Sequence, residues 1–172
     1  MHPLLCKTAT ALVVTALAQG VAQAALFAVD PGPYLPASGN FAAWYQDAHG
    51  RTLDLCLSKA VSSRVASTPG APTYMCSLIP NPGIFDDTQP LVFPTNFPDE
   101  AFWATGETTI VDAARGIDLT YVSALEAAFS GGDPLEGDQI SFARIRIRVD
   151  VPVAGTYVIT HPYGVDVFNI DT

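Results

Sequence analysis

The stretch RIRIRVDVPVAGTYVIT, residues Arg144–Thr160, decides the fold class of this chain. In its first half, isoleucine and valine at positions 145, 147, 149 and 151 alternate with arginine and aspartate. A period of two places the apolar side chains on one face of a strand and the charged ones on the other. Residues 152–155 then have the composition of a turn, and a second strand is predicted over 156–160.

The same period occurs upstream, over residues 117–129. Apolar side chains at 117, 119, 121, 125, 127 and 129 share one parity, which predicts a strand. A short helix is the alternative, because Ser123 and Glu126 fit a capping box and Gly131 could end such a helix. We favour the strand, since the helix would have only two turns.

Further strands are predicted on both sides of these segments. A hairpin with strands at about 42–46 and 52–58 turns at Asp47–Gly50, and Leu53, Leu55 and Leu57 should share its buried face. A strand over 165–170 follows the turn His161–Gly164. Between Pro69 and Pro98, seven prolines exclude a long helix or a central strand. The predicted fold is an all-β antiparallel β-sandwich, jelly-roll or immunoglobulin-like, with a Pro-rich irregular middle segment.

The first 24 residues are predicted to be a secretory signal peptide. They combine Lys7, an apolar stretch over 9–17 that is too short to span a membrane, and the small residues Ala22 and Ala24 at the exit. We therefore expect a secreted, extracellular or cell-surface protein, with the periplasm as an alternative. No membrane insertion is expected after cleavage. Residues 25–40 form an extended N-terminal arm, and 41–172 form one sandwich domain. The sequence ends in a strand pattern, as a truncated chain would, although an ordinary edge strand would end similarly.

The charge balance excludes two classes of partner. The chain has 8 Lys and Arg against 17 Asp and Glu, a net charge of −9. Cleavage after Ala24 removes Lys7 and no acid, which makes the charge −10. Nucleic-acid binding and attraction to anionic membranes both require a basic surface. The expected partner is another extracellular or surface protein, or a glycan.

Two of the three cysteines remain after cleavage of the signal peptide, namely Cys56 and Cys76. An even pair in an exported chain predicts a disulfide. Zinc binding is the alternative, but two thiols 20 residues apart without a nearby histidine make a poor zinc site.

The segment Ile145–Thr160 resembles a strand–turn–strand unit of secreted bacterial β-sandwich modules, which include carbohydrate-binding jelly rolls and immunoglobulin-like domains. Together with Trp44-Tyr-Gln-Asp47 and His161-Pro-Tyr-Gly164, it makes the chain similar to the N-terminal part of large, uncharacterised secreted bacterial surface proteins. The resemblance implies architecture and location, and it assigns no functional residue.

No catalytic motif stands out in this sequence. The chain lacks the Gly-x-Ser-x-Gly nucleophile motif. Downstream of the signal peptide, His49 and His161 are the candidate imidazole bases, and we interpret both as exposed or structurally satisfied. Paired carboxylates could serve a glycosidase, but with 17 acids the sequence does not single out a pair.

Three further features are candidate sites. Asp133, Glu136 and Asp138 share a Gly-rich loop and form a candidate calcium site, although we prefer to interpret them as a solvated acidic hairpin tip. No other cofactor is expected. Trp44 and Trp103 are candidate sugar-stacking residues, although we favour a place in the hydrophobic core for each of them.

The row Arg144, Arg146 and Arg148 needs carboxylate partners from neighbouring strands, for which Asp118 and Asp54 are candidates. A patch for an acidic ligand is the alternative. Taken together, the sequence favours a non-catalytic secreted module with a structural or adhesive role. A carbohydrate-binding module is the second hypothesis, and a glycan-acting hydrolase is the third.

Overall fold

The computed structural model describes residues 26–80 and 83–171. The predicted signal peptide lies outside the described residues. The chain is nearly all-β, with antiparallel sheets. The elements, in chain order, are the strand β1 (Leu26–Val29), the 3₁₀ turn η1 (Pro36–Ser38), and the strands β2 (Trp44–Asp47), β3 (Thr52–Asp54), β4 (Glu100–Asp112), β5 (Ile117–Phe129), β6 (Gln139–Asp150), β7 (Gly155–His161) and β8 (Gly164–Ile170).

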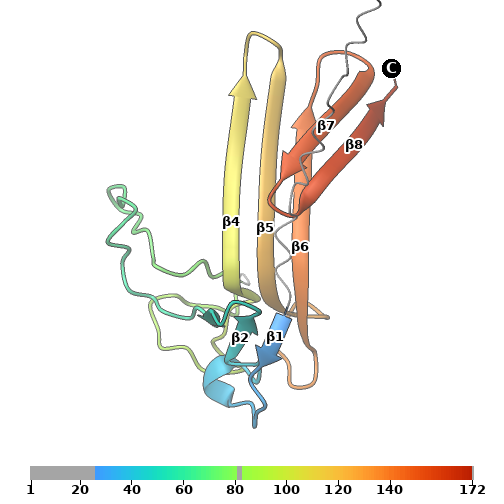
Figure 1. The fold of residues 1–172 in the computed structure, drawn as a ribbon. Coiled ribbons are helices and arrows are strands. Elements are labelled where there is room, and N and C mark those ends of the chain that lie inside the picture. Colours follow the sequence, from blue (N-terminus) through green and yellow to red (C-terminus); the bar gives the residue numbers. More distant parts are fainter. Residues whose placement is uncertain (1–25, 81–82, 172) are drawn as a thin grey trace, which may run out of the picture.

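The largest sheet consists of the three long strands in the order β4-β5-β6. Figure 1 shows these strands rising side by side from a base that contains the small sheet β1-β2-β3, with the hairpin β7–β8 near their upper ends. The segment 117–129 is a strand along its whole length, so the helix alternative is wrong. Tertiary pairing on both sides decides this, because β5 bonds to β4 and to β6 throughout.

The predicted hairpin near residue 50 is confirmed, with β2 paired to β3 and Trp44 opposite Asp54. Its second strand is shorter than expected and ends at Asp54. Leu55 is buried and Leu57 packs against the core, but Leu53 is exposed. The segment expected to be an extended arm contributes β1, which pairs with β2 at the other edge of the small sheet.

The core lies between the small sheet and the lower half of one face of the long sheet. Aromatic rings of Phe41, Tyr45, Phe97, Trp103 and Phe129 meet there at centroid distances of 4.7–6.2 Å. On the upper half of the same face, the His161 ring of the hairpin stacks on Tyr121 of β5 at 5.6 Å. The small sheet and the hairpin therefore cover the same face of the long sheet, which makes the fold sandwich-like.

The Pro-rich middle segment is irregular in its described part. Between β3 and β4 the chain forms isolated bridges, such as Val61 to Tyr74 and Ile79 to Glu100. Cys56 and Cys76 form a disulfide with Cα atoms 5.4 Å apart, as the sequence predicts. The disulfide joins the end of the small sheet to this segment, and the backbone N–H of Cys56 donates to the Phe102 carbonyl of β4.

Candidate functional site

Trp44 lines a groove on the outward face of the small sheet. The groove measures about 570 Å³, and its walls include Pro33, Leu35, Leu57, Asp30 and Asp54. Side chains of successive strand residues point to opposite faces. Tyr45 packs on Trp103 in the core at 4.7 Å, so Trp44 faces away from the core. This groove, called the Trp44 groove below, is the candidate functional site.

The two aspartates of the Trp44 groove lie on either side of the indole. Asp54 is opposite Trp44 on β3, and the Asp30 backbone N–H donates to the Trp44 carbonyl at 3.0 Å from the β1 side. The Asp30 carboxylate accepts hydrogen bonds from the backbone N–H groups of Gly32 and Ala43, at 3.0 and 2.8 Å. These bonds fix the position of Asp30. Among the described residues, neither aspartate forms an ion pair.

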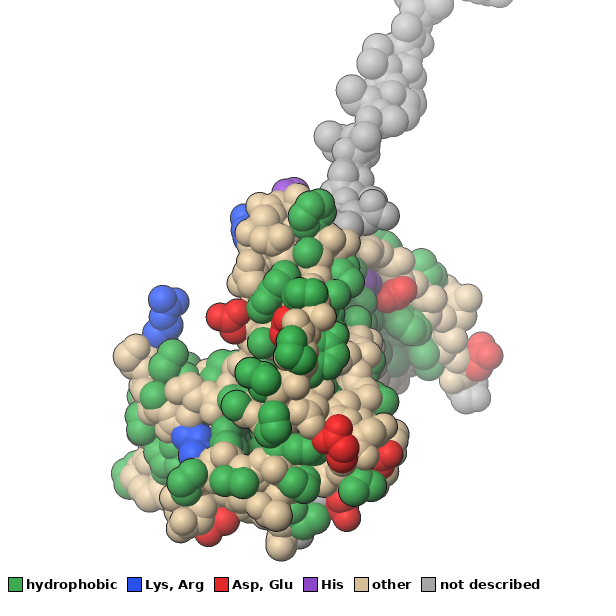
Figure 2. All heavy atoms as spheres, turned by 90° about the horizontal axis from the view of Figure 1, so that it is seen from below, with side chains coloured by type: hydrophobic (Ala, Val, Ile, Leu, Met, Phe, Trp, Pro, Cys, Tyr) green, Lys and Arg blue, Asp and Glu red, His purple; other side chains and the backbone are tan. Residues whose placement is uncertain are grey.

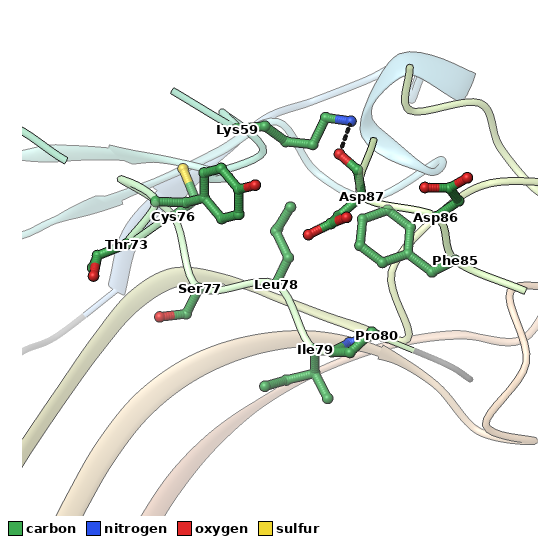
Figure 3. Close-up of a pocket in the computed structure, with 11 residues that line it drawn as sticks. Lys59, Thr73, Cys76, Ser77, Leu78, Ile79, Pro80, Phe85, Asp86 and Asp87 are labelled. Carbon is green, nitrogen blue, oxygen red and sulfur yellow. Dashed lines mark hydrogen bonds between the residues drawn. The ribbon is translucent and has the colours of Figure 1, made fainter. Parts of the chain in front are cut away.

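A second groove lies beside the disulfide, between the segment around Leu78 and the loop at Phe85–Asp87 (Figure 3). It measures about 660 Å³. Two of its charged side chains, Lys59 and Asp86, are already used by the fold. The Lys59 ammonium donates to the backbone carbonyls of Asp87, at 2.7 Å, and of Gln89.

Asp86, which also lines the second groove, is occupied within its own loop. It accepts hydrogen bonds from the Thr88 hydroxyl and backbone N–H, and these bonds, with the charge of Lys59, lower the pKa of its carboxyl. We therefore interpret the second groove as a packing gap between loops. The Trp44 groove differs, because no lysine, arginine or histidine lines it. The exposed carboxylate of Asp54 has no hydrogen bond or ion pair within the described residues.

Trp103, the other predicted sugar-stacking residue, is 4% exposed. A β-bulge between Phe102 and Ala104 turns its ring into the core, where its indole N–H donates to the Ala42 carbonyl at 3.0 Å. Trp103 is therefore not an exposed platform. Its immediate neighbours in the sequence are apolar, and acidic residues precede them, so only the bulge reveals why the ring points inward.

The arginine row forms part of a cross-strand network, but with other partners than predicted. Arg144 Nη2 lies 2.9 Å from Glu126 Oε2 on β5 and 3.9 Å from Glu100 Oε1 on β4. Arg146 and Arg148 form no ion pair among the described residues. Neither expected partner, Asp118 or Asp54, forms an ion pair among the described residues. Arg144 lies opposite Ala124 and far from Asp118 along β5, while Arg148 lies opposite Thr120, on the same face as Asp118, without pairing with it.

Glu126 is 1% exposed, which sequence reasoning missed. Its parity differs from that of the apolar residues of β5, so alternation gives no sign that it is buried. Burial raises the pKa of its carboxyl, the charge of Arg144 opposes this effect, and the charge of Glu100 adds to it.

The acidic loop of the calcium hypothesis keeps its carboxylates apart. Glu136 accepts a hydrogen bond from the Asn40 side chain of the base. Asp138 pairs through its backbone with Ser130 across the loop. Within residues 26–80 and 83–171, no three His, Cys, Asp or Glu side chains gather closely enough to hold a metal ion.

The two histidines occupy different settings. His49 is exposed in the β2–β3 turn. Both ring nitrogens of His161 are engaged within the hairpin: Nε2 lies 3.0 Å from Asp166 Oδ2, and Nδ1 accepts from the Tyr163 backbone N–H at 3.3 Å. The ring is also stacked on Tyr121, so His161 attaches the hairpin to the long sheet.

The outer face of the hairpin exposes three valines, which alternate with Thr156, Thr160 and Asn169. Val158, Val165 and Val167 are 62%, 53% and 59% exposed, and Val158 pairs directly with Val167. The single charged residue of β7 and β8 at neutral pH is Asp166, which shares the inner face with His161. Edge strands commonly carry charges or prolines that block pairing with another chain, and these two strands have none on their outer face.

Comparison of the chain with protein-family models, with curated proteins and with solved structures finds no match. In the described part of the chain, no helix is both long enough and apolar enough to cross a membrane.

Proposed function

We propose that this chain is a non-catalytic secreted module with an adhesive role, which contacts another surface protein through the outer face of the β7–β8 hairpin. The exposed valine pair Val158 and Val167 carries this proposal. Contiguous apolar surface that remains exposed in a folded chain commonly marks a contact with another protein. An added strand would also bond to the free backbone groups at the hairpin edge.

A second copy of the chain is the first partner to test. Antiparallel pairing of β8 with another β8 about Val167 places Val165 opposite Asn169 and Asp166 opposite Phe168. No two like charges face each other in this arrangement. In a chain with net charge −9, most other contacts between copies would oppose acidic groups.

Bead clustering measures this adhesion directly. Beads coated with the exported protein should cluster, and the double substitution Val158→Lys with Val167→Lys should abolish clustering, because it places charges in the contact. The matched control is Thr105→Lys with Thr109→Lys, which adds the same two charges at exposed positions of β4. If wild-type beads stay dispersed, or if both double variants behave alike, the hairpin is not the adhesive surface.

The carbohydrate-binding hypothesis retains one candidate, because Trp103 is buried while Trp44 is half-buried and lines a groove. Sugar-binding platforms gain affinity from several stacked rings, and the two tryptophans do not lie together on one surface. A glycan array with wild type and Trp44→Leu tests this second candidate. Saturable glycan binding that Trp44→Leu removes would favour it over the adhesive module.

A further inference from the structure

The Trp44 groove concentrates negative charge beside an aromatic face. Asp30, directly after β1, and Asp54 on β3 lie on the two sides of Trp44, and all three line the same groove. No lysine, arginine or histidine is among the lining residues. Hydrogen bonds hold the Asp30 carboxylate in place, and they leave its net charge without a neighbouring cation. The fold therefore keeps two uncompensated carboxylates in one concave site.

This combination selects a cation over an anionic or neutral ligand. A cation over an indole face is attracted by the ring quadrupole, and Trp is the most favourable residue for this contact. The two carboxylates add direct attraction and can accept N–H hydrogen bonds. Pro33, Leu35 and Leu57 provide apolar walls, which suit an aliphatic stem that ends in a charged group.

The surroundings of the groove indicate that the cation belongs to a protein. Tyr34 and Leu35 are 48% and 59% exposed next to the groove. Seen from below, hydrophobic side chains are spread over much of this end of the molecule, with a few separate acidic and basic groups (Figure 2). A single cation in one groove binds weakly, whereas apolar contacts around a charged anchor suit a protein interface.

We propose that the Trp44 groove binds the side chain of a lysine or arginine exposed on a partner protein. The charged head lies against the indole of Trp44, between the carboxylates of Asp30 and Asp54, and the stem contacts Leu35 and Leu57. This site is separate from the hairpin, so it adds a second contact to the proposed adhesive module.

NMR titration of the full exported chain with small probes tests the proposal. The probes are N-acetyl-lysine methylamide, N-acetyl-arginine methylamide and the uncharged N-acetyl-norleucine methylamide, together with a neutral oligosaccharide. The indole N–H resonance of Trp44 is distinguished from that of Trp103 with the Trp44→Leu variant. Both cationic probes should shift the Trp44 resonance saturably, and added salt should weaken this binding because it screens the carboxylates.

Variants separate the charge from the fold. Asp54→Asn keeps the side-chain shape and should weaken the binding of the cationic probes by up to about fivefold, the upper end of the range for one exposed charge pair. Asp118→Asn removes an exposed acid on β5, outside the groove, and should leave the affinity unchanged. Asp54→Asn should also leave bead clustering through the hairpin intact, so the two proposals can fail independently.

Three outcomes would overturn the proposal. The first is equal binding of norleucine and lysine probes, which would show that charge plays no part. The second is binding of the oligosaccharide without the cations, which would make the groove a sugar site. The third is an absence of saturable binding by either cation while the variant spectra show a folded chain.

Discussion

Arg144 Nη2 lies 2.9 Å from Oε2 of the buried Glu126, and it links β6 to β5 across the outer face of the long sheet. The same guanidinium is 3.9 Å from Glu100 on β4 and covers the ring of Phe142, with its centre 5.3 Å from the ring centroid. One side chain thus ties all three long strands together. The pair itself contributes little net stability, but removal of Arg144 alone is costly, because it leaves a buried carboxylate without its partner.

Arg144→Met should lower the free energy of unfolding by about 2–4 kcal/mol, because the charge on Glu126 loses its compensation. Urea unfolding followed by tryptophan fluorescence measures the change. Arg146→Met is the control, since Arg146 lies two residues along the same strand face and has no ion pair among the described residues. Equal losses in the two variants would contradict a special role for the Arg144–Glu126 pair.

Glu126 should make stability depend on pH in a defined direction. Burial raises the pKa of its carboxyl above the ordinary 4.5, so the folded chain binds this proton more tightly than the unfolded chain. Its stabilising contribution is complete below about pH 4.5 and is lost as the pH rises through the folded value. As the pH increases, the free energy of unfolding of wild type should therefore decrease relative to that of Glu126→Gln.

Unfolding of both proteins in urea between about pH 4 and pH 7 measures that difference. Asp47 and Asp86 have lowered pKa values, from hydrogen bonds to Arg51 and Thr88 respectively, and they contribute the opposite trend. Both are present in wild type and variant, so their effects cancel in the comparison. A difference that stays constant with pH would show that Glu126 does not titrate in this range.

The disulfide should stabilise the irregular middle segment. Replacement of Cys56 and Cys76 by serine should cost about 3 kcal/mol, because a covalent link across 20 positions restricts the unfolded chain. Thermal unfolding compares the variant with the oxidised protein. In addition, alkylation without reductant should find no free thiol in the mature exported protein, and two free thiols would show that the link is absent there.

Gly39 should tolerate alanine less well than Gly50, although both have positive φ values of 65° and 78°. At Gly39 an added Cβ would lie 2.6 Å from ring atoms of Phe97, whereas at Gly50 nothing lies within 4 Å. Both alanine variants incur the backbone cost of about 1 kcal/mol, and Gly39→Ala adds about 1–3 kcal/mol of overpacking. Chemical unfolding of the two variants measures both costs, and equal losses would contradict the close packing of Phe97.

The candidate sites show where sequence reasoning reaches its limit. Trp44 is a candidate from its local sequence, but its flanking aspartates come from the end of β1 and from β3, and only the pairing of three strands brings them together. The sequence does not distinguish Trp103 from Trp44, and only the structure shows that a bulge turns Trp103 into the core. The carboxylates at 133–138 are near in sequence, but the loop directs Glu136 to Asn40.

Alternation of apolar and polar residues predicted strands over 117–129, over about 144–151, over 156–160 and over 165–170. The density of prolines predicted the irregular segment between residues 69 and 98, and the number of cysteines predicted the disulfide. These features depend on residues close in sequence, or on the only two cysteines left after signal cleavage. Tertiary structure alone decided that Arg144 pairs with Glu126, that Trp103 is buried, and that Asp30 and Asp54 flank Trp44. Each of these depends on the register between strands, and a shift of one residue moves every side chain to the other face of the sheet.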